Sequence, residues 1–234
     1  MSNDAMPQRP LTPSGAPDPS ALLHYGDKLI DIRKRNQTLF TQAQESHLHR
    51  KRTTATPIPI RRILAEHHQF QASPLSLPYL TFAPSTPSLL TAHASIEGPP
   101  ESPYAGGIFW LHIRYPSEYP KCAMQVRFLT PIYHPNVSAE GEICMSILDC
   151  DWSPILSTRT VLLSVLSRLD DPELEEPVRG DAARRYREDY PGFWEQARRD
   201  TEVYAIGEEP PVGVEVEVEV EEGGDGGEGE ELDG

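Results

Sequence analysis

Residues 131–154, PIYHPNVSAEGEICMSILDCDWSP, form the stretch around which we expect the rest of the chain to be organised. The stretch has little helical or strand periodicity, yet apolar segments flank it on both sides. Cys144 lies eight residues after Asn136, which itself follows His134 and Pro135. Catalytic residues are often found on irregular segments that a rigid scaffold holds in place. A chemical site is therefore sought here first.

Strand-like runs lie upstream of this stretch, at residues 92–97, 107–115 and 124–129, with one more expected near residues 79–82. In the second run, Phe109, Leu111 and Ile113 alternate with polar or amphipathic neighbours, as in a half-buried strand. Turns rich in proline and glycine separate the runs. Short connections of this kind favour an antiparallel meander.

Helical patterns lie on both sides of the strands. A short helix is expected over residues 61–70, and a longer one with a broad apolar stripe over residues 157–169. Ser157 or Thr158 can cap the longer helix. Two more helices are expected after it, the first of them capped by Asp181.

The two ends of the chain differ from its middle in composition. We predict an N-terminal extension over residues 1–56, disordered to partly helical, and one folded domain over residues 57–206. Residues 207–234 are predicted to be a disordered acidic tail, because they hold 12 acidic residues and no Lys or Arg. The chain carries a net charge of -15, but 24 acidic against 21 basic residues remain without the tail, or about -3. This balance argues against nucleic acid as a partner.

The cysteines and the apolar residues indicate a compartment. Three cysteines, Cys122, Cys144 and Cys150, cannot all pair, so we expect reduced thiols. The N-terminus lacks the basic start and apolar core of a secretory signal. No run of 18 apolar residues occurs, so no membrane span or membrane partner is expected. The predicted location is the cytoplasm, the nucleus or both.

The residues alone leave the purpose of Cys144 open between a nucleophile and an ordinary buried cysteine. A cysteine attacks as the thiolate, and the acidic neighbours Glu142, Asp149 and Asp151 disfavour that form. His134 could act as a general base or could hold a turn.

The sequence shows no motif that is typical of metal binding or of nucleotide binding. His134, Cys144 and Cys150 lack the paired spacing of a zinc site. No glycine-rich phosphate loop and no Gly-x-Ser-x-Gly elbow occurs.

Three segments together resemble the core of the ubiquitin-conjugating enzymes: SPYAGGIFWLHIRYPSEYP (102–120), IYHPNVSAEGEICMSIL (132–148) and DWSPILSTRTVLLSVLSRL (151–169). The likeness runs from about Arg61 to Ala205. It implies an α+β fold with an N-terminal helix, a four-stranded antiparallel meander sheet and C-terminal helices.

The resemblance also implies a reaction. Cys144 would accept ubiquitin from an activating enzyme as a thioester and pass it to substrate lysines, usually with a ligase. Asn136 would support the oxyanion or the loop, and Glu176 would orient the lysine. His134 matches a mainly structural position. The activating enzyme uses ATP upstream, so no cofactor and no metal is expected.

Ligase-facing positions follow from the same resemblance. They are Arg61, Arg62, Pro120, Lys121, Ser153, Pro154 and Ile155. Lys121 stands where several relatives carry an aromatic residue, and Ser146 replaces a common aspartate, so the ligase and even the modifier stay open. The alternatives are a non-catalytic ubiquitin-binding or scaffold variant, a carrier of another ubiquitin-like modifier, and a cysteine hydrolase. The acidic tail is expected either to dock on a basic groove of a ligase or only to add solubility.

Overall fold

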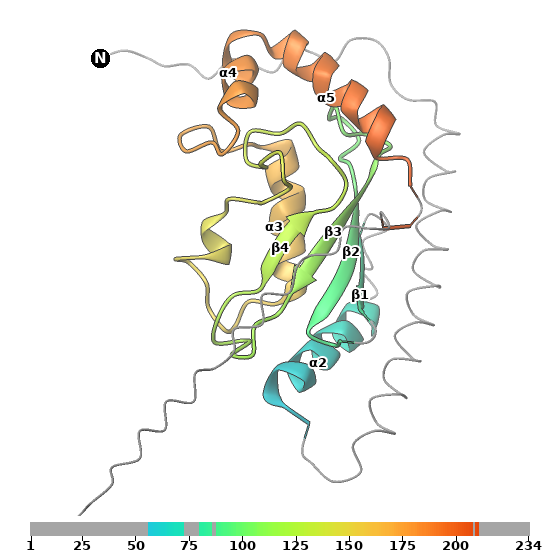
Figure 1. The fold of residues 1–234 in the computed structure, drawn as a ribbon, viewed down its shortest axis with the longest axis vertical. Coiled ribbons are helices and arrows are strands. Elements are labelled where there is room, and N and C mark those ends of the chain that lie inside the picture. Colours follow the sequence, from blue (N-terminus) through green and yellow to red (C-terminus); the bar gives the residue numbers. More distant parts are fainter. Residues whose placement is uncertain (1–55, 73–79, 86–87, 208, 211–234) are drawn as a thin grey trace, which may run out of the picture.

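The strands form one antiparallel sheet in the order β1-β2-β3-β4 (Figure 1). The computed structural model describes residues 56–72, 80–85, 88–207 and 209–210. The strands are β1 (Leu80–Pro84), β2 (Thr91–Glu97), β3 (Ile108–Arg114) and β4 (Gln125–Phe128). Ala94 pairs with Leu111, and Leu111 with Phe128, so the alternating apolar side chains share one face. The predicted antiparallel meander is confirmed.

Helices cover one face and the ends of this sheet. They are α2 (Ile58–Ala72), α3 (Thr158–Asp170), α4 (Gly180–Glu188) and α5 (Tyr190–Tyr204), with a short 3-10 helix η1 (Ser146–Leu148) before α3. Figure 1 shows α2 at one end of the strands and α5 at the other. The expected α+β fold is confirmed. None of the helices in the described ranges is long and apolar enough to cross a membrane.

The helix caps were only partly predictable. The Ser157 side chain accepts from the amide of Thr160 and caps α3, as expected. The prediction for α4 was wrong, because Arg179 takes the N-cap position and Asp181 lies inside the first turn. The backbone amide of Arg179 donates to the carbonyl of Pro135 at 3.0 Å, so a tertiary contact fixes where this helix begins.

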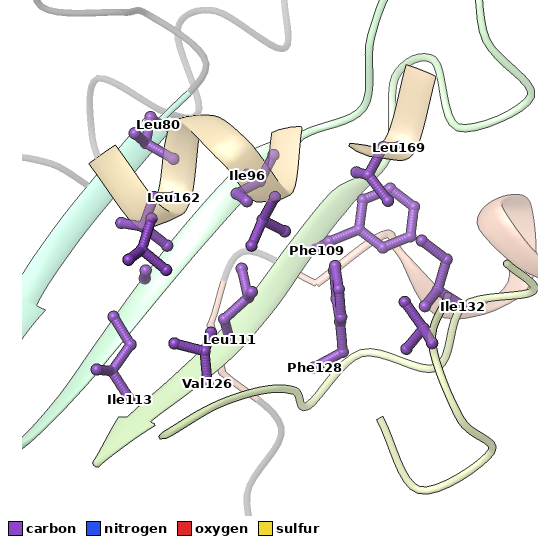
Figure 2. Packing of buried hydrophobic residues seen from close by; sticks show 14 of the residues in the cluster. Leu80, Ile96, Phe109, Leu111, Ile113, Val126, Phe128, Ile132, Leu162 and Leu169 are labelled. Atoms are coloured by element: carbon purple, nitrogen blue, oxygen red, sulfur yellow. The ribbon is translucent and has the colours of Figure 1, made fainter. Parts of the chain in front are cut away.

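The apolar face of the sheet and α3 enclose the core. Figure 2 shows Leu162 and Leu169 of α3 in the same cluster as Ile96, Phe109 and Leu111 of the sheet. All five side chains are at most 4% exposed. Fully burying one such side chain contributes about 1.5–3 kcal/mol. The core therefore provides a rigid base for the long irregular segment between β4 and α3.

The predicted domain boundaries are not decided by the fold. The extension over residues 1–56 lies outside the described residues except for its last residue. The acidic tail over 207–234 lies outside them except for residues 207, 209 and 210.

Candidate active site

The segment after β4 folds back on itself, so that Gly141 lies against Phe128 and Ile143 lies against Val137. The amide of Phe128 donates to the carbonyl of Gly141 at 2.8 Å, and Val137 forms a backbone bridge with Ile143. Gly141 has a φ of +89°, and a Cβ there would lie 2.1 Å from the Phe128 carbonyl oxygen. Only glycine fits this turn without a shift of the backbone.

This turn brings Cys144 next to Asn136. The backbone amide of Cys144 donates to the carbonyl of Asn136 at 3.3 Å. The side chain of Cys144 is exposed, and η1 begins two residues later. The eight-residue spacing seen in the sequence is therefore the length of a loop whose two ends are hydrogen-bonded. An exposed thiol on such a loop can meet a large acyl donor.

The side-chain amide of Asn136 joins this loop to the segment after α3. Its Nδ2 donates to the carbonyl of Glu173 at 2.6 Å, and the amide of Glu173 donates to its Oδ1 at 2.8 Å. Asn136 is 1% exposed. An Asn amide has two N–H donors, and this pairing uses one of them. Asn136 therefore supports the loop and keeps one side-chain N–H that this pairing does not use.

His134 uses both ring nitrogens inside the protein. Its Nδ1 accepts from the amide of Asn136 at 3.0 Å. Its Nε2 lies 3.0 Å from the carbonyl of Arg168, to which it must therefore donate. Burial lowers the pKa of His134 to about 3, so the ring is neutral near pH 7. Neither nitrogen is left to take a proton from Cys144.

Arg179, which the sequence did not single out, holds the other side of the same turn. Its Nη1 donates to the carbonyl of Ile132 at 3.0 Å, and its guanidinium lies 4.7 Å from the ring centre of Tyr133. The hydroxyl of Tyr104 donates to the carbonyl of Tyr133 at 2.8 Å. One arginine in a polar stretch gives no sequence signal. Tyr104 does lie in the quoted Tyr-Ala-Gly-Gly turn.

A hollow of about 300 Å³ opens between the residues after Cys144 and the C-terminal half of α3. Its lining consists of Met145, Ser146, Ile147, Ser164, Ser167, Arg168 and Asp171. Glu176 is exposed on the segment that begins at Glu173. The hollow begins one residue after Cys144 and reaches Arg168, whose guanidinium lies 3.8 Å from the carboxylate of Glu173.

The predicted partner-binding residues come together through contacts of their neighbours. Arg62 on α2 donates through Nη2 to the carbonyl of Leu156 at 3.0 Å, and Trp152 Nε1 donates to the carbonyl of Pro120 at 3.0 Å. The three predicted segments therefore adjoin one another. Arg61 and Lys121 are exposed, and Ile155 is 86% exposed.

The buried carboxylate of Glu66 supports this surface from inside the protein. The sequence did not predict this role. It accepts from Arg62 Nε at 2.5 Å, from the hydroxyl of Tyr119 at 2.6 Å, and from the amide and hydroxyl of Thr158, both at 2.8 Å. Burial, and then the bond to Glu66, raises the pKa of Tyr119. Glu66 thereby links α2 to the N-terminus of α3 and to the 119–121 loop. A glutamate within a polar helix gives no sign of this burial.

A metal ion and the other two cysteines are the remaining candidates for chemistry in the described part of the chain. Within the described ranges, no three His, Cys, Asp or Glu residues gather into a group that could hold a metal ion. Cys122 and Cys150 are free and exposed, like Cys144. Of the three, only Cys144 follows directly on the loop that His134 and Asn136 hold.

A four-stranded sheet packed on one long helix, with an exposed cysteine at the end of a buried His-Pro-Asn turn, defines a class: enzymes that carry an acyl group on cysteine. The model of the family described as "Ubiquitin-conjugating enzyme" matches residues 62–201, and the chain belongs to this family.

Two curated relatives are similar over nearly their whole length. Ubiquitin-conjugating enzyme E2 N of Macaca fascicularis is 40% identical over 146 residues, which cover 62% of this chain and 95% of the relative. Ubiquitin-conjugating enzyme E2 13 of Saccharomyces cerevisiae is 40% identical over 145 residues, with 62% and 94% covered. The protein is a ubiquitin-conjugating enzyme, as the sequence predicted, and neither relative favours a non-catalytic variant. Ubiquitin, an activating enzyme and ligases are the partners of such enzymes in general.

Proposed function

We propose that Cys144 is the residue that carries ubiquitin. Its sulfur attacks the thioester carbonyl on the activating enzyme, a new thioester forms at Cys144, and the activating enzyme's cysteine leaves and takes the proton. A substrate lysine amine then attacks this thioester, so that an isopeptide bond forms and the Cys144 sulfur leaves. The observation that carries the proposal is the exposed Cys144 side chain, whose backbone amide is bonded to the Asn136 carbonyl at 3.3 Å.

Asn136 is proposed to support transfer from its buried position. Its two bonds to Glu173 hold the cysteine loop to the segment that continues to Glu176. The second N–H of Nδ2 is proposed to donate to the oxyanion that forms when the lysine attacks. Losing an oxyanion donor typically costs about 10²–10³ in rate.

Glu176 and His134 are proposed to have unlike roles. The carboxylate of Glu176 lies in solvent, where it can attract the cationic lysine and orient its amine. His134 is proposed to be structural, since both nitrogens are bonded to backbone groups and the ring is neutral. The hydrolase alternative needs a histidine with a free nitrogen, which these bonds disfavour.

The ligase is proposed to bind the surface formed by Arg61, Arg62, Pro120, Lys121, Ser153, Pro154 and Ile155. The exposed Ile155 offers an apolar anchor there, with Lys121 as a nearby charge. The guanidinium of Arg62 already bonds Glu66 and Leu156, so we propose that it positions this surface more than it binds the partner.

The remaining proposals concern the domain bounds, the cofactors and the location of the enzyme. The catalytic core is proposed to span residues 57–206, with the extension and the acidic tail outside it. The enzyme is proposed to use no cofactor of its own and to act in the cytoplasm, the nucleus or both.

One gel tests the central proposal and the alternatives. The protein is incubated with activating enzyme, ATP and ubiquitin, and the products are separated with and without a thiol reductant. We expect a reductant-sensitive adduct in the wild type and in the matched controls Cys122→Ala and Cys150→Ala, and none in Cys144→Ala. An adduct that survives in Cys144→Ala would refute the assignment. If adducts formed only with another ubiquitin-like modifier, that modifier and not ubiquitin would be the group that Cys144 carries.

A further inference from the structure

The face of the sheet turned away from α3 carries a row of basic side chains across three strands. His93 of β2 pairs in register with His112 of β3, and His112 pairs with Arg127 of β4. The two imidazole centres lie 5.6 Å apart. Arg114 lies two residues further along β3, on the same face. We call His93, His112, Arg114 and Arg127 the basic row.

The described part of the chain leaves this row without anionic partners. No ion pair within it involves Arg114 or Arg127, and the buried Nε–H of Arg127 has no acceptor there. Burial and then the positive neighbours His93, Arg127 and Arg114 lower the pKa of His112. Two guanidinium groups without an ion-pair partner in the described ranges make this face attractive to an added anion.

Uncharged polar groups also face the row, since Gln125 of β4 and Thr91 of β2 pair in register with Arg114. The hydroxyl of Ser85 lies 3.2 Å from Nδ1 of His93. Glu97 is four residues from His93 along β2, about 13 Å away in an extended strand. Glu142 forms a backbone bridge with Arg127, but its side chain is exposed and makes no ion pair with it within the described ranges. The row therefore keeps uncompensated positive charge.

The C-terminal end of the described domain lies on this same face. The amide of Ile108 donates to the carbonyl of Ala205 at 2.8 Å. Trp110 Nε1 then donates to the carbonyl of Gly207 at 3.0 Å. Trp110 is two residues before His112 on β3, about 7 Å away along the strand. The acidic tail thus begins next to the basic row.

We propose that the part of the acidic tail after Gly207, residues 208–234, docks in cis on the basic row. Its carboxylates would accept from the terminal N–H groups of the Arg127 and Arg114 guanidinium groups, and from the imidazoles once these are protonated. Length is not limiting, because 27 residues reach about 90 Å when extended and a four-stranded sheet is about 14 Å wide. A short tether gives the carboxylates an effective concentration on the order of millimolar.

This docking makes the acidic tail a cover for the outer sheet face. A partner that binds this face has to displace it. Salt weakens the docking through screening, and acidification strengthens it as His93 and His112 gain protons. The proposal does not depend on ubiquitin transfer, so a binding measurement alone can test it.

The test compares NMR spectra of two full-length proteins labelled with ¹⁵N. One is the wild type, and in the other the 12 acidic residues of the tail are replaced by their amides, which keeps the length. We expect differences in the backbone amides of His93 and His112 and in the side-chain Nε signal of Arg127. The differences should be unchanged by tenfold dilution and should vanish in about 1 M salt, where charges are screened within about 3 Å.

Two matched substitutions complete the test. In wild-type background, Arg127→Gln should move the signals of the tail glutamates towards those in 1 M salt, whereas Arg184→Gln, which removes the same charge from an exposed position on α4, should leave them in place. Arg114→Gln, which removes the other permanent charge of the basic row, repeats the test if Arg127→Gln disturbs the strand. Equal effects of Arg127→Gln and Arg184→Gln would overturn the docking, and so would identical signals of His93, His112 and Arg127 in the two full-length proteins. Differences that grow with concentration would also overturn it, because they place the tail on a second molecule.

Discussion

Asn136 binds the backbone of Glu173 with both ends of its side-chain amide, at 2.6 and 2.8 Å. The two residues are 37 positions apart, so the pair closes the cysteine loop against the segment that follows α3. A residue assigned to chemistry is thus also a structural clamp. The two roles predict different kinetics.

Replacing Asn136 by Ala removes both bonds, and we expect unfolding to become easier by about 2 kcal/mol. If Nδ2 also meets the oxyanion, discharge to free lysine should fall by about 10²–10³ while charging by the activating enzyme falls far less. Single-turnover discharge and charging assays give the two rates, and a denaturant titration gives the stability. A purely structural role would lower both rates by a similar factor.

Gly141 is expected to be irreplaceable in the turn. Gly141→Ala meets the Phe128 carbonyl at 2.1 Å and forces a left-handed backbone on alanine, so stability and thioester formation should both drop. Gly180→Ala is the matched control, because nothing lies within 4 Å of the added Cβ. Thermal unfolding and the charging gel are the measurements. Normal charging of Gly141→Ala would mean that the loop is less tightly specified than its contacts imply.

Two buried histidines should make the protein lose stability in acid. Burial lowers the pKa of His134 to about 3 and of His67 to about 4, below the usual 6.5. The unfolded chain therefore binds protons that the folded chain does not bind. The free energy of unfolding is highest above about pH 6.5 and falls as the pH drops towards 4. Each histidine should contribute a loss of about 2 kcal/mol by pH 5.

Urea unfolding between pH 7 and pH 5 measures this loss. His134→Gln should be less stable at pH 7 and should show a shallower pH dependence. The exposed His68 offers the control, since His68→Gln should keep the wild-type slope. An unchanged slope in His134→Gln would contradict the buried neutral ring.

Removing the buried Glu66 carboxylate should be among the most destabilising single changes on α2. Glu66→Ala removes the acceptor of Arg62 Nε, of the Tyr119 hydroxyl and of Thr158, and we expect a loss of about 3–5 kcal/mol. Glu195→Ala breaks an exposed pair with Arg199 and should cost at most about 1 kcal/mol. Chemical denaturation compares the two. Similar losses would show that the carboxylate is not truly buried.

The proposed ligase surface can be separated from catalysis. Ile155→Glu places a charge on an exposed apolar side chain, so ligase-stimulated discharge should fall tenfold or more. Charging and unassisted discharge should stay within twofold, because the Ile155 side chain is 86% exposed and has no group that could take part in the chemistry. Val178→Glu, on another exposed apolar residue, controls for added charge. Equal loss in both variants would remove Ile155 from the surface.

The sequence by itself determined the scaffold and the position of the thiol. Alternation in β2, β3 and β4 and the apolar stripe of α3 are local patterns, and the Ser157 cap acts within one turn. The spacing from Asn136 to Cys144 is likewise written in the chain. Only the tertiary structure decided which polar groups are buried and what they bind. The contacts of Asn136 with Glu173, of His134 with Arg168 and of Glu66 with Thr158 join positions 34 to 92 residues apart. No local propensity encodes such pairs, since each forms only after the core has brought its segments together.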